Sequence, residues 1–129
     1  MAQERSTRQR KAIEDALIRA DRPLTPEELL VLAQAGVPRL GIATIYRALK
    51  DLRDGGQVVA VEVPGHAICY ETAQRGHHHH FHCRQCQRVF EVEGCVHGVN
   101  AIAPAGFRVE EHEIVLKGLC QACADPQRA

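Results

Sequence analysis

Four cysteines of the chain come in two closely spaced pairs. Cys83 and Cys86 form one CxxC motif, and Cys120 and Cys123 form a second one. Four thiolates can hold one Zn²⁺ ion in a closed tetrahedral site of the structural type. Residues 87–119, which separate the motifs, exceed the usual gap of a zinc ribbon and would enclose a small folded unit. A redox dithiol or two unrelated turns are the alternatives, but two such motifs in one short chain favour structural zinc.

A run of histidines directly precedes the first CxxC motif and can serve two metal sites. If residues 77–82 form a strand, alternate side chains face opposite sides. His78, His80 and His82 then share one face, whereas His77 and His79 share the other. The side chains that can complete these sites are Glu71 and Glu91 for the first and His112 for the second. Imidazole and carboxylate suit Zn, Fe, Mn, Co or Ni, and a histidine-rich surface loop without a specific ion is the alternative.

All eight histidines and all six cysteines lie after residue 65 of the 129-residue chain. The rest of the composition is ordinary for a globular protein, because 45% of the residues are hydrophobic, 25% are charged and the net charge is zero. No apolar run approaches the roughly 20 residues that cross a membrane, and residues 1–11 are too polar for a signal peptide. We therefore predict a cytoplasmic protein without a membrane partner, in which clustered thiols bind metal rather than form disulfides.

The first half of the sequence has the outline of a winged helix. Thr25 and Glu28 form a capping box at the start of its second helix. The expected helices cover residues 10–20, 26–35 and 41–54, and the expected strands cover residues 58–63 and 67–72.

The outer face of the third expected helix carries side chains that can read DNA: Thr44, Tyr46, Arg47 and Lys50. The tyrosine ring can contact thymine methyl groups, and the basic side chains can reach phosphates or guanine edges. Residues 1–11 predict a short basic arm ahead of the first helix, in which Arg5 and Arg10 can contact phosphates. A plain three-helix core with a polar surface and a solvated N-terminus is the alternative.

The second half changes character after a plausible hinge at residues 74–76. We expect strands at residues 81–83, 89–93 and 107–116 and a short helix at residues 95–103. A unit of this size has a thin hydrophobic core, so it requires a metal ion or a partner subunit for stability.

Three segments of the chain resemble one family. Residues 41–49, GIATIYRAL, resemble the recognition helix of the ferric uptake regulator family. The family's sensing hinge is similar to the segment that begins at Tyr70 and Glu71 and continues through the histidine run to the first CxxC motif. The family's N-terminal arm is similar to residues 5–10.

The resemblance implies a homodimeric, metal-responsive transcription factor, normally a repressor, that binds a palindromic operator in double-stranded DNA. It implies an α+β fold with a winged-helix DNA-binding domain at residues 1–73, a hinge at 74–76 and a small α/β metal-binding dimerisation domain at 77–129. By the same resemblance, Tyr46 and Arg47 contact DNA, and the four CxxC cysteines hold structural Zn²⁺. The implied regulatory ligands are Glu71, His78, His80 and Glu91 at the sensing site, and His77, His79 and His112 at a second site.

The chain departs from the family pattern at both regulatory sites. The iron and peroxide branches usually add a histidine from the DNA-binding half, but this chain has no histidine before His66. The sensing site then lacks one ligand or recruits Glu62, His66 or Cys69, and a thiolate would favour Zn²⁺ over Fe²⁺ or Mn²⁺. The second site lacks its usual acid, since Gly98 falls near that position, and His97 or Cys95 can substitute.

Two other functional classes compete with a DNA-binding metalloregulator. A zinc-dependent hydrolase would need an open metal position that activates water, whereas the cysteines here form a closed set of four. An intracellular metal buffer or chaperone would explain the histidines but not the segment GIATIYRAL. We therefore predict that the protein is not an enzyme.

Overall fold

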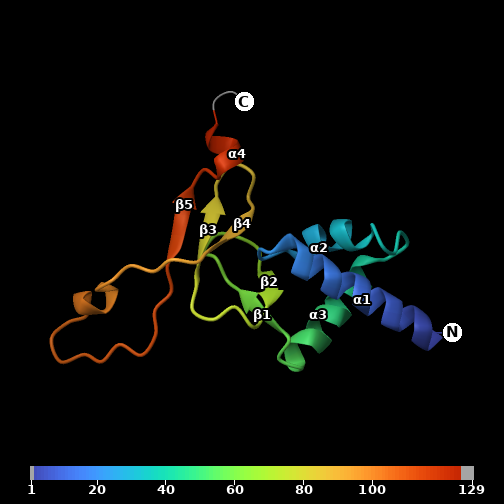
Figure 1. Cartoon of the computed structure of the whole chain (residues 1–129), viewed down its shortest axis with the longest axis horizontal. Helices are drawn as coiled ribbons and strands as arrows, with labels where there is room; N and C mark the ends of the chain where they lie inside the picture. The colour runs from blue at the N-terminus through green and yellow to red at the C-terminus, as the bar shows by residue number, and fades with distance from the viewer. Residues whose placement is uncertain (1, 126–129) are drawn as a thin grey trace. The chain divides into compact units, whose positions relative to one another are not determined.

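The computed structural model describes residues 2–125 of the chain. The chain divides into two compact units, Met1–Arg75 and Gly76–Ala129, and the boundary falls within the expected hinge. The first unit consists of three helices followed by a hairpin, and the second contains a three-stranded sheet with short helical turns (Figure 1). The α+β fold class predicted from the sequence is confirmed. Within residues 2–125, no helix has the length and apolar character needed to cross a membrane.

Three helices enclose the hydrophobic core of the first unit. These are α1 at Ala2–Ala20, α2 at Pro26–Ala33 and α3 at Ile42–Asp54. Each helix contributes fully buried side chains, as does the loop before α2, and the largest of them are Ile13, Leu17, Leu24, Leu29, Ile45 and Leu52. Full burial of one such side chain contributes about 1.5–3 kcal/mol relative to its exposure. The apolar spacing that predicted the helices therefore marks their core-facing sides.

The N-terminal segment differs from its prediction. We expected a basic arm ahead of a helix that begins near Arg10, but α1 already begins at Ala2. Residues 3–8 are exposed on that helix. Its basic residues are consequently held on a helical surface rather than on an extended arm.

A capping box begins α2, as predicted. The backbone N–H of Glu28 donates to Oγ1 of Thr25 at 3.1 Å, and the N–H of Thr25 donates to Oε1 of Glu28 at 3.0 Å. The other Glu28 oxygen accepts a hydrogen bond from Nη2 of Arg22 at 2.8 Å. Burial alone would raise the pKa of Glu28, but the backbone bond to Thr25 and the Arg22 guanidinium outweigh it and lower that pKa.

The wing is the antiparallel hairpin of β1, Val58–Val61, and β2, Cys69–Thr72. Both strands are shorter than predicted. Backbone hydrogen bonds between Leu24 and Tyr70 attach the hairpin to the loop before α2. The first unit is therefore one packed body from helix to wing.

The second unit is built on a three-stranded sheet in the order β4-β3-β5. The central strand, β3 at His79–Cys83, pairs antiparallel with β4 at Val89–Val92 and parallel with β5 at Val115–Gly118. The short helix α4, Gln121–Ala124, follows β5. This topology brings the end of the histidine run and both CxxC motifs onto one sheet and its edges.

Two predictions for the second unit were wrong. The strand expected at residues 107–116 is confined to β5, because only Val115 and the residues after it pair with β3, and residues 104–111 are all exposed. The helix expected at residues 95–103 is a single 3₁₀ turn, η1 at Val99–Ile102. Gly98, directly before it, has φ +80°, a left-handed conformation that interrupts an α-helix.

Candidate metal centres and DNA-binding face

The four CxxC cysteines converge in the second unit. Their Sγ atoms lie within 4.8 Å of one another, and that of Cys86 lies 3.8 Å from that of Cys120. A tetrahedral Zn²⁺ ion with bonds of about 2.3 Å to sulfur separates its sulfur ligands by roughly 3.8 Å. None of the four is in a disulfide. The donor set and its spacing fit one structural zinc ion.

Backbone amides prepare one of these thiols for ligation. Burial raises the pKa of Cys83, but hydrogen bonds from the backbone N–H groups of Cys120, Cys86 and Gln85 outweigh it and lower the pKa to about 6. Burial and hydrogen bonds among the cysteine side chains raise the pKa of Cys123 to about 12. The lowered pKa favours the thiolate form of Cys83, whereas Zn²⁺ must displace the proton of Cys123 when it binds.

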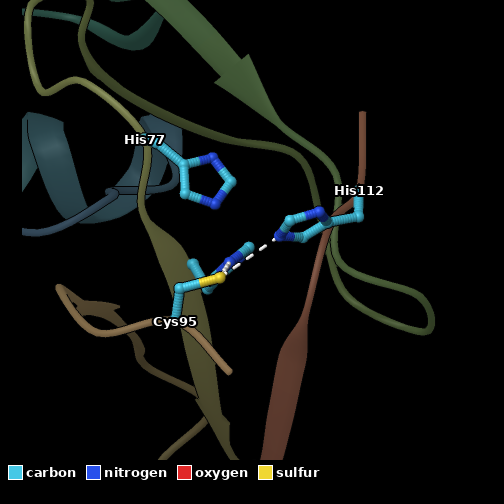
Figure 2. A group of neighbouring side chains, drawn as sticks. His77, Cys95 and His112 are labelled. Atoms are coloured by element: carbon cyan, nitrogen blue, oxygen red, sulfur yellow. Dashed lines mark hydrogen bonds between the residues drawn. The ribbon is translucent and has the colours of Figure 1, made fainter. Parts of the chain in front are cut away.

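A second donor cluster joins His77 and His79 to Cys95 and His112. The four ligand atoms lie within 4.8 Å of one another. Figure 2 shows His77, Cys95 and His112 turned toward a common point from three separate segments of the second unit. The Sγ atom of Cys95 lies 3.2 Å from Nε2 of His79 and 3.2 Å from Nε2 of His112. Of the two residues proposed to replace the missing acid, Cys95 belongs to this cluster, whereas His97 is exposed and does not.

Two residues that the sequence did not suggest orient these histidines. Asn100 Oδ1 accepts a hydrogen bond from Nδ1 of His112 at 3.1 Å, which leaves the lone pair on Nε2, facing Cys95. The backbone N–H of Ile114 donates to Nδ1 of His79 at 3.1 Å. His79 is 3% exposed, and this burial, with neighbouring His77 and His112, lowers its pKa. The lowered pKa favours the neutral imidazole of His79, the form that binds metal ions.

The other predicted group in this unit consists of His78, His80 and Glu91. Nε2 of His78 lies 3.1 Å and Nε2 of His80 lies 3.8 Å from the same Glu91 oxygen, Oε2. Glu91 on β4 is the cross-strand partner of His80 on β3. Two imidazoles and a carboxylate at these distances suit a divalent cation. His78 and His80 thus lie in one cluster and His77 and His79 in the other, although β3 begins only at His79. His82 joins neither cluster, and its Nε2 lies 3.0 Å from Oε1 of Gln87.

The remaining candidates for the sensing site lie in the first unit. Cys69 and Glu71 are both buried and, two positions apart on β2, share one face of the hairpin. The Sγ atom of Cys69 lies 3.7 Å from Nδ1 of His66, whereas Glu62 is exposed. Burial, with the carboxylates of Glu28 and Glu71, raises the pKa of Cys69 to about 12, so this thiol is neutral without metal.

The predicted DNA-binding residues lie along α1 and α3. Arg5, Arg10, Tyr46, Arg47 and Lys50 are exposed, and Thr44 is half-buried. Arg47 donates to Oγ1 of Thr44 at 3.3 Å, and Lys50 to Asp54 at 3.2 Å. Arg10 reaches across from α1 to Asp51 on α3, at 3.7 Å, beside a groove that Thr44 and Arg47 also line. Exposed ion pairs of this kind contribute little to stability, so the cations can exchange their partners for phosphates.

The sequence model of one family, described as the ferric uptake regulator family, matches residues 1–117. The chain belongs to the ferric uptake regulator family. A curated relative, the ferric uptake regulation protein of Campylobacter jejuni subsp. jejuni, is 31% identical over 122 residues, which cover 91% of this chain and 78% of that protein. Members of the family are DNA-binding transcription regulators and not enzymes, which excludes the hydrolase alternative.

Solved structures of ferric uptake regulators share the fold. The Helicobacter pylori regulator Fur, described as having three functional metal binding sites, matches with a TM-score of 0.71 at 21% identity, covering 92% of this chain and 81% of that one. FurB from M. tuberculosis, described as a zinc uptake regulator, matches with a TM-score of 0.52 at 32% identity, covering 92% of this chain and 95% of that one. The two units here are accordingly the winged-helix part and the β-rich dimerisation domain of the ferric uptake regulator fold. The chain is a metal-responsive transcriptional regulator with a four-cysteine structural site and His/Glu sites.

Proposed function

We propose that this ferric uptake regulator is a homodimeric, cytoplasmic repressor of metal-homeostasis genes, and that it senses Zn²⁺. It binds a palindromic operator in double-stranded DNA when the sensing site is loaded. The observation that carries the proposal is the group of His78, His80 and Glu91 directly after the boundary between the two units. We propose that a residue of the first unit adds a ligand to a metal ion held there.

Glu71 is the proposed ligand from the winged-helix unit, and Cys69 or His66 is the candidate for a further one. Metal bound from both sides of the hinge restricts the winged helix relative to the dimer core. The two α3 helices of a dimer then match successive major-groove half-sites of a palindrome. Without metal the two units sample more arrangements, so the binding-competent state is less populated.

Zinc is favoured over iron and manganese for two reasons. The first unit has no histidine in the region before β1 from which the iron and peroxide branches take one. A thiol, Cys69, lies on the same face of β2 as Glu71. Sulfur ligands favour Zn²⁺, whereas Mn²⁺ prefers oxygen ligands. The likeness to FurB, at 32% identity, supports the same preference.

A gel-shift titration tests the proposal with an operator selected by the protein from random-sequence duplexes. We expect tight binding with Zn²⁺ and weak binding after chelation, with Mn²⁺ and Fe²⁺ less effective at equal free concentration. Equal affinity in the loaded and the metal-free protein would contradict metal control. If Cys69→Ser loses one zinc equivalent and no longer binds the operator more tightly with Zn²⁺, Cys69 belongs to the sensing site. If its response to Zn²⁺ is unchanged, Glu71 remains as the ligand from the first unit.

A further inference from the structure

We propose that Cys95 supplies a thiolate to the cluster of His77, His79 and His112, which makes it an N₃S metal centre selective for Zn²⁺ over Fe²⁺ and Mn²⁺. This inference deepens the proposed function, because it assigns a metal and a fourth ligand to the second centre. It concerns residues of the second unit alone.

The spacing of the donor atoms supports a single ion. A tetrahedral ion with bonds of about 2.0 Å to nitrogen and about 2.3 Å to sulfur separates these donors by roughly 3.5 Å. The Cys95 sulfur lies 3.2 Å from one nitrogen of His79 and 3.2 Å from one of His112. The His77 ring completes the group, with its centroid 4.6 Å from that of His79 and 4.8 Å from that of His112. A small outward movement of the side chains makes room for the ion.

The hydrogen bonds around the cluster show how each ligand is prepared. Asn100 fixes the His112 tautomer whose Nε2 lone pair faces the sulfur. Such outer partners orient ligands and raise metal affinity. His79 differs, since its Nδ1 accepts the Ile114 amide hydrogen and the ring proton resides on Nε2. An ion bound through this Nε2 would require the ring proton to leave it for Nδ1 or for solvent, and a proton on Nδ1 would give up the hydrogen bond from Ile114.

The chemistry of the donors predicts the choice of metal. Within residues 2–125 this cluster includes no carboxylate. Thiolate and imidazole suit Zn²⁺, whereas Mn²⁺ is better served by carboxylate and water. Four protein ligands also close the coordination sphere, as in structural rather than catalytic zinc sites. The centre would join three segments of the unit: the one before β3, the loop after β4 and the one before β5.

Cobalt substitution tests the assignment in the full-length dimer. The starting protein carries zinc only in the four-cysteine site, and it is titrated with Co²⁺. Metal analysis should find one zinc per chain both before and after the titration. We expect intense visible ligand-field bands of tetrahedral cobalt and a near-ultraviolet sulfur-to-cobalt charge-transfer band. Cys95→Ser should lose a charge-transfer component that the control Val96→Ser, a change at the exposed neighbouring residue, retains. Its Zn²⁺ affinity at this centre should fall at least about tenfold, the lower end of the loss seen when an outer-sphere partner is removed.

Two further results decide the inference. Cys95→Asp, which supplies an oxygen donor, should keep a metal ion at this centre but reduce the preference for Zn²⁺ over Mn²⁺. A Cys95→Ser spectrum identical to that of the unmodified protein, or an unchanged preference in Cys95→Asp, would overturn the proposal. The cobalt spectrum requires no DNA, so a failed gel shift would contradict the proposed function and leave this assignment intact. A cobalt spectrum that does not depend on Cys95 would contradict this assignment and leave the proposed function intact.

Discussion

The Nδ1 atom of His112 lies 3.1 Å from Oδ1 of Asn100, so an amide from the 3₁₀ turn orients a predicted metal ligand. Asn100→Ala removes this acceptor and frees the imidazole ring to turn. We expect Zn²⁺ to bind the second centre about 10–100-fold more weakly, as is typical when an outer-sphere partner is lost. Competition with a chromophoric chelator measures the change. Asn100→Asp keeps an acceptor and should retain most of the affinity, whereas an unchanged affinity in Asn100→Ala would contradict the orienting role.

Cys95 is exposed, so its reactivity reports on the metal. We expect iodoacetamide to alkylate Cys95 in protein that carries only structural zinc, and excess Zn²⁺ to suppress the reaction, because a metal-bound thiolate is no longer free to attack. Peptide mass spectrometry locates the modified residue. The His112→Ala variant should lose the protection. Equal alkylation with and without Zn²⁺ in the unmodified protein would mean that the sulfur is not a ligand.

The four-cysteine zinc stabilises only the unit that contains it. Cys120→Ser removes one of four ligands, and we expect residues 76–125 to become sensitive to protease while the helices of Met1–Arg75 remain folded. The reason is that the helical unit has its own core, whereas the sheet unit depends on its metal. Limited proteolysis with mass mapping checks this, and Val96→Ser, a change at an exposed residue of the same unit outside both metal groups, is the control. Parallel loss of both units would show that they fold together.

The Arg22–Glu28 pair makes the stability of the first unit depend on pH. The pKa of Glu28 is lowered in the folded protein, so its contribution is present above the unfolded value of about 4.3 and is lost as the pH falls through the folded value. Glu28→Gln can keep the capping bond but not the ion pair. We expect it to be less stable than the unmodified protein at pH 7, with a deficit that shrinks as the pH falls below about 4.3, as measured by urea unfolding of the helical signal. A deficit that does not change with pH would argue against the ion pair.

Operator binding should depend on Arg47, an exposed residue of α3. Loss of one phosphate contact lowers the slope of log affinity against log salt by about 1, and loss of a guanine contact costs about 1–3 kcal/mol at one position of the site. We expect Arg47→Ala to show one of these effects in gel shifts with zinc-loaded protein. Arg84→Ala, an exposed arginine of the second unit, is the control and should bind normally. Normal binding by Arg47→Ala would remove α3 from the DNA-reading role.

Local patterns predicted the first unit well because its structure is largely local. The capping box of Thr25 and Glu28 and the apolar spacing around Ile45 both act within a few residues of the chain. The two strands of the hairpin were predicted too long, and the start of α1 was misplaced. Its first turns carry mostly polar, exposed side chains, so they lack the apolar periodicity by which a helix is recognised.

The second unit was predicted less well because its structure depends on distant partners. The alternation of residues 107–114 is typical of a strand, but a strand also needs a neighbour, and β3 pairs only from Val115 onward. Spacing found the four-cysteine group, since each CxxC motif is local. It could not choose between Cys95 and His97, because the choice depends on how the loop after β4 places Cys95 beside His112. Asn100 carried no signal, since a lone asparagine has no motif.

The exposed segment at residues 104–111 lies between the two CxxC motifs. A single peptide-bond cleavage after Arg108 would separate the cysteines of one motif from those of the other in the covalent chain. The zinc ion would still join the two fragments through its four sulfur bonds, and the β3–β5 ladder would add to them. Structural zinc then acts as a reversible cross-link, so the nicked protein migrates as one species until a chelator releases it as two.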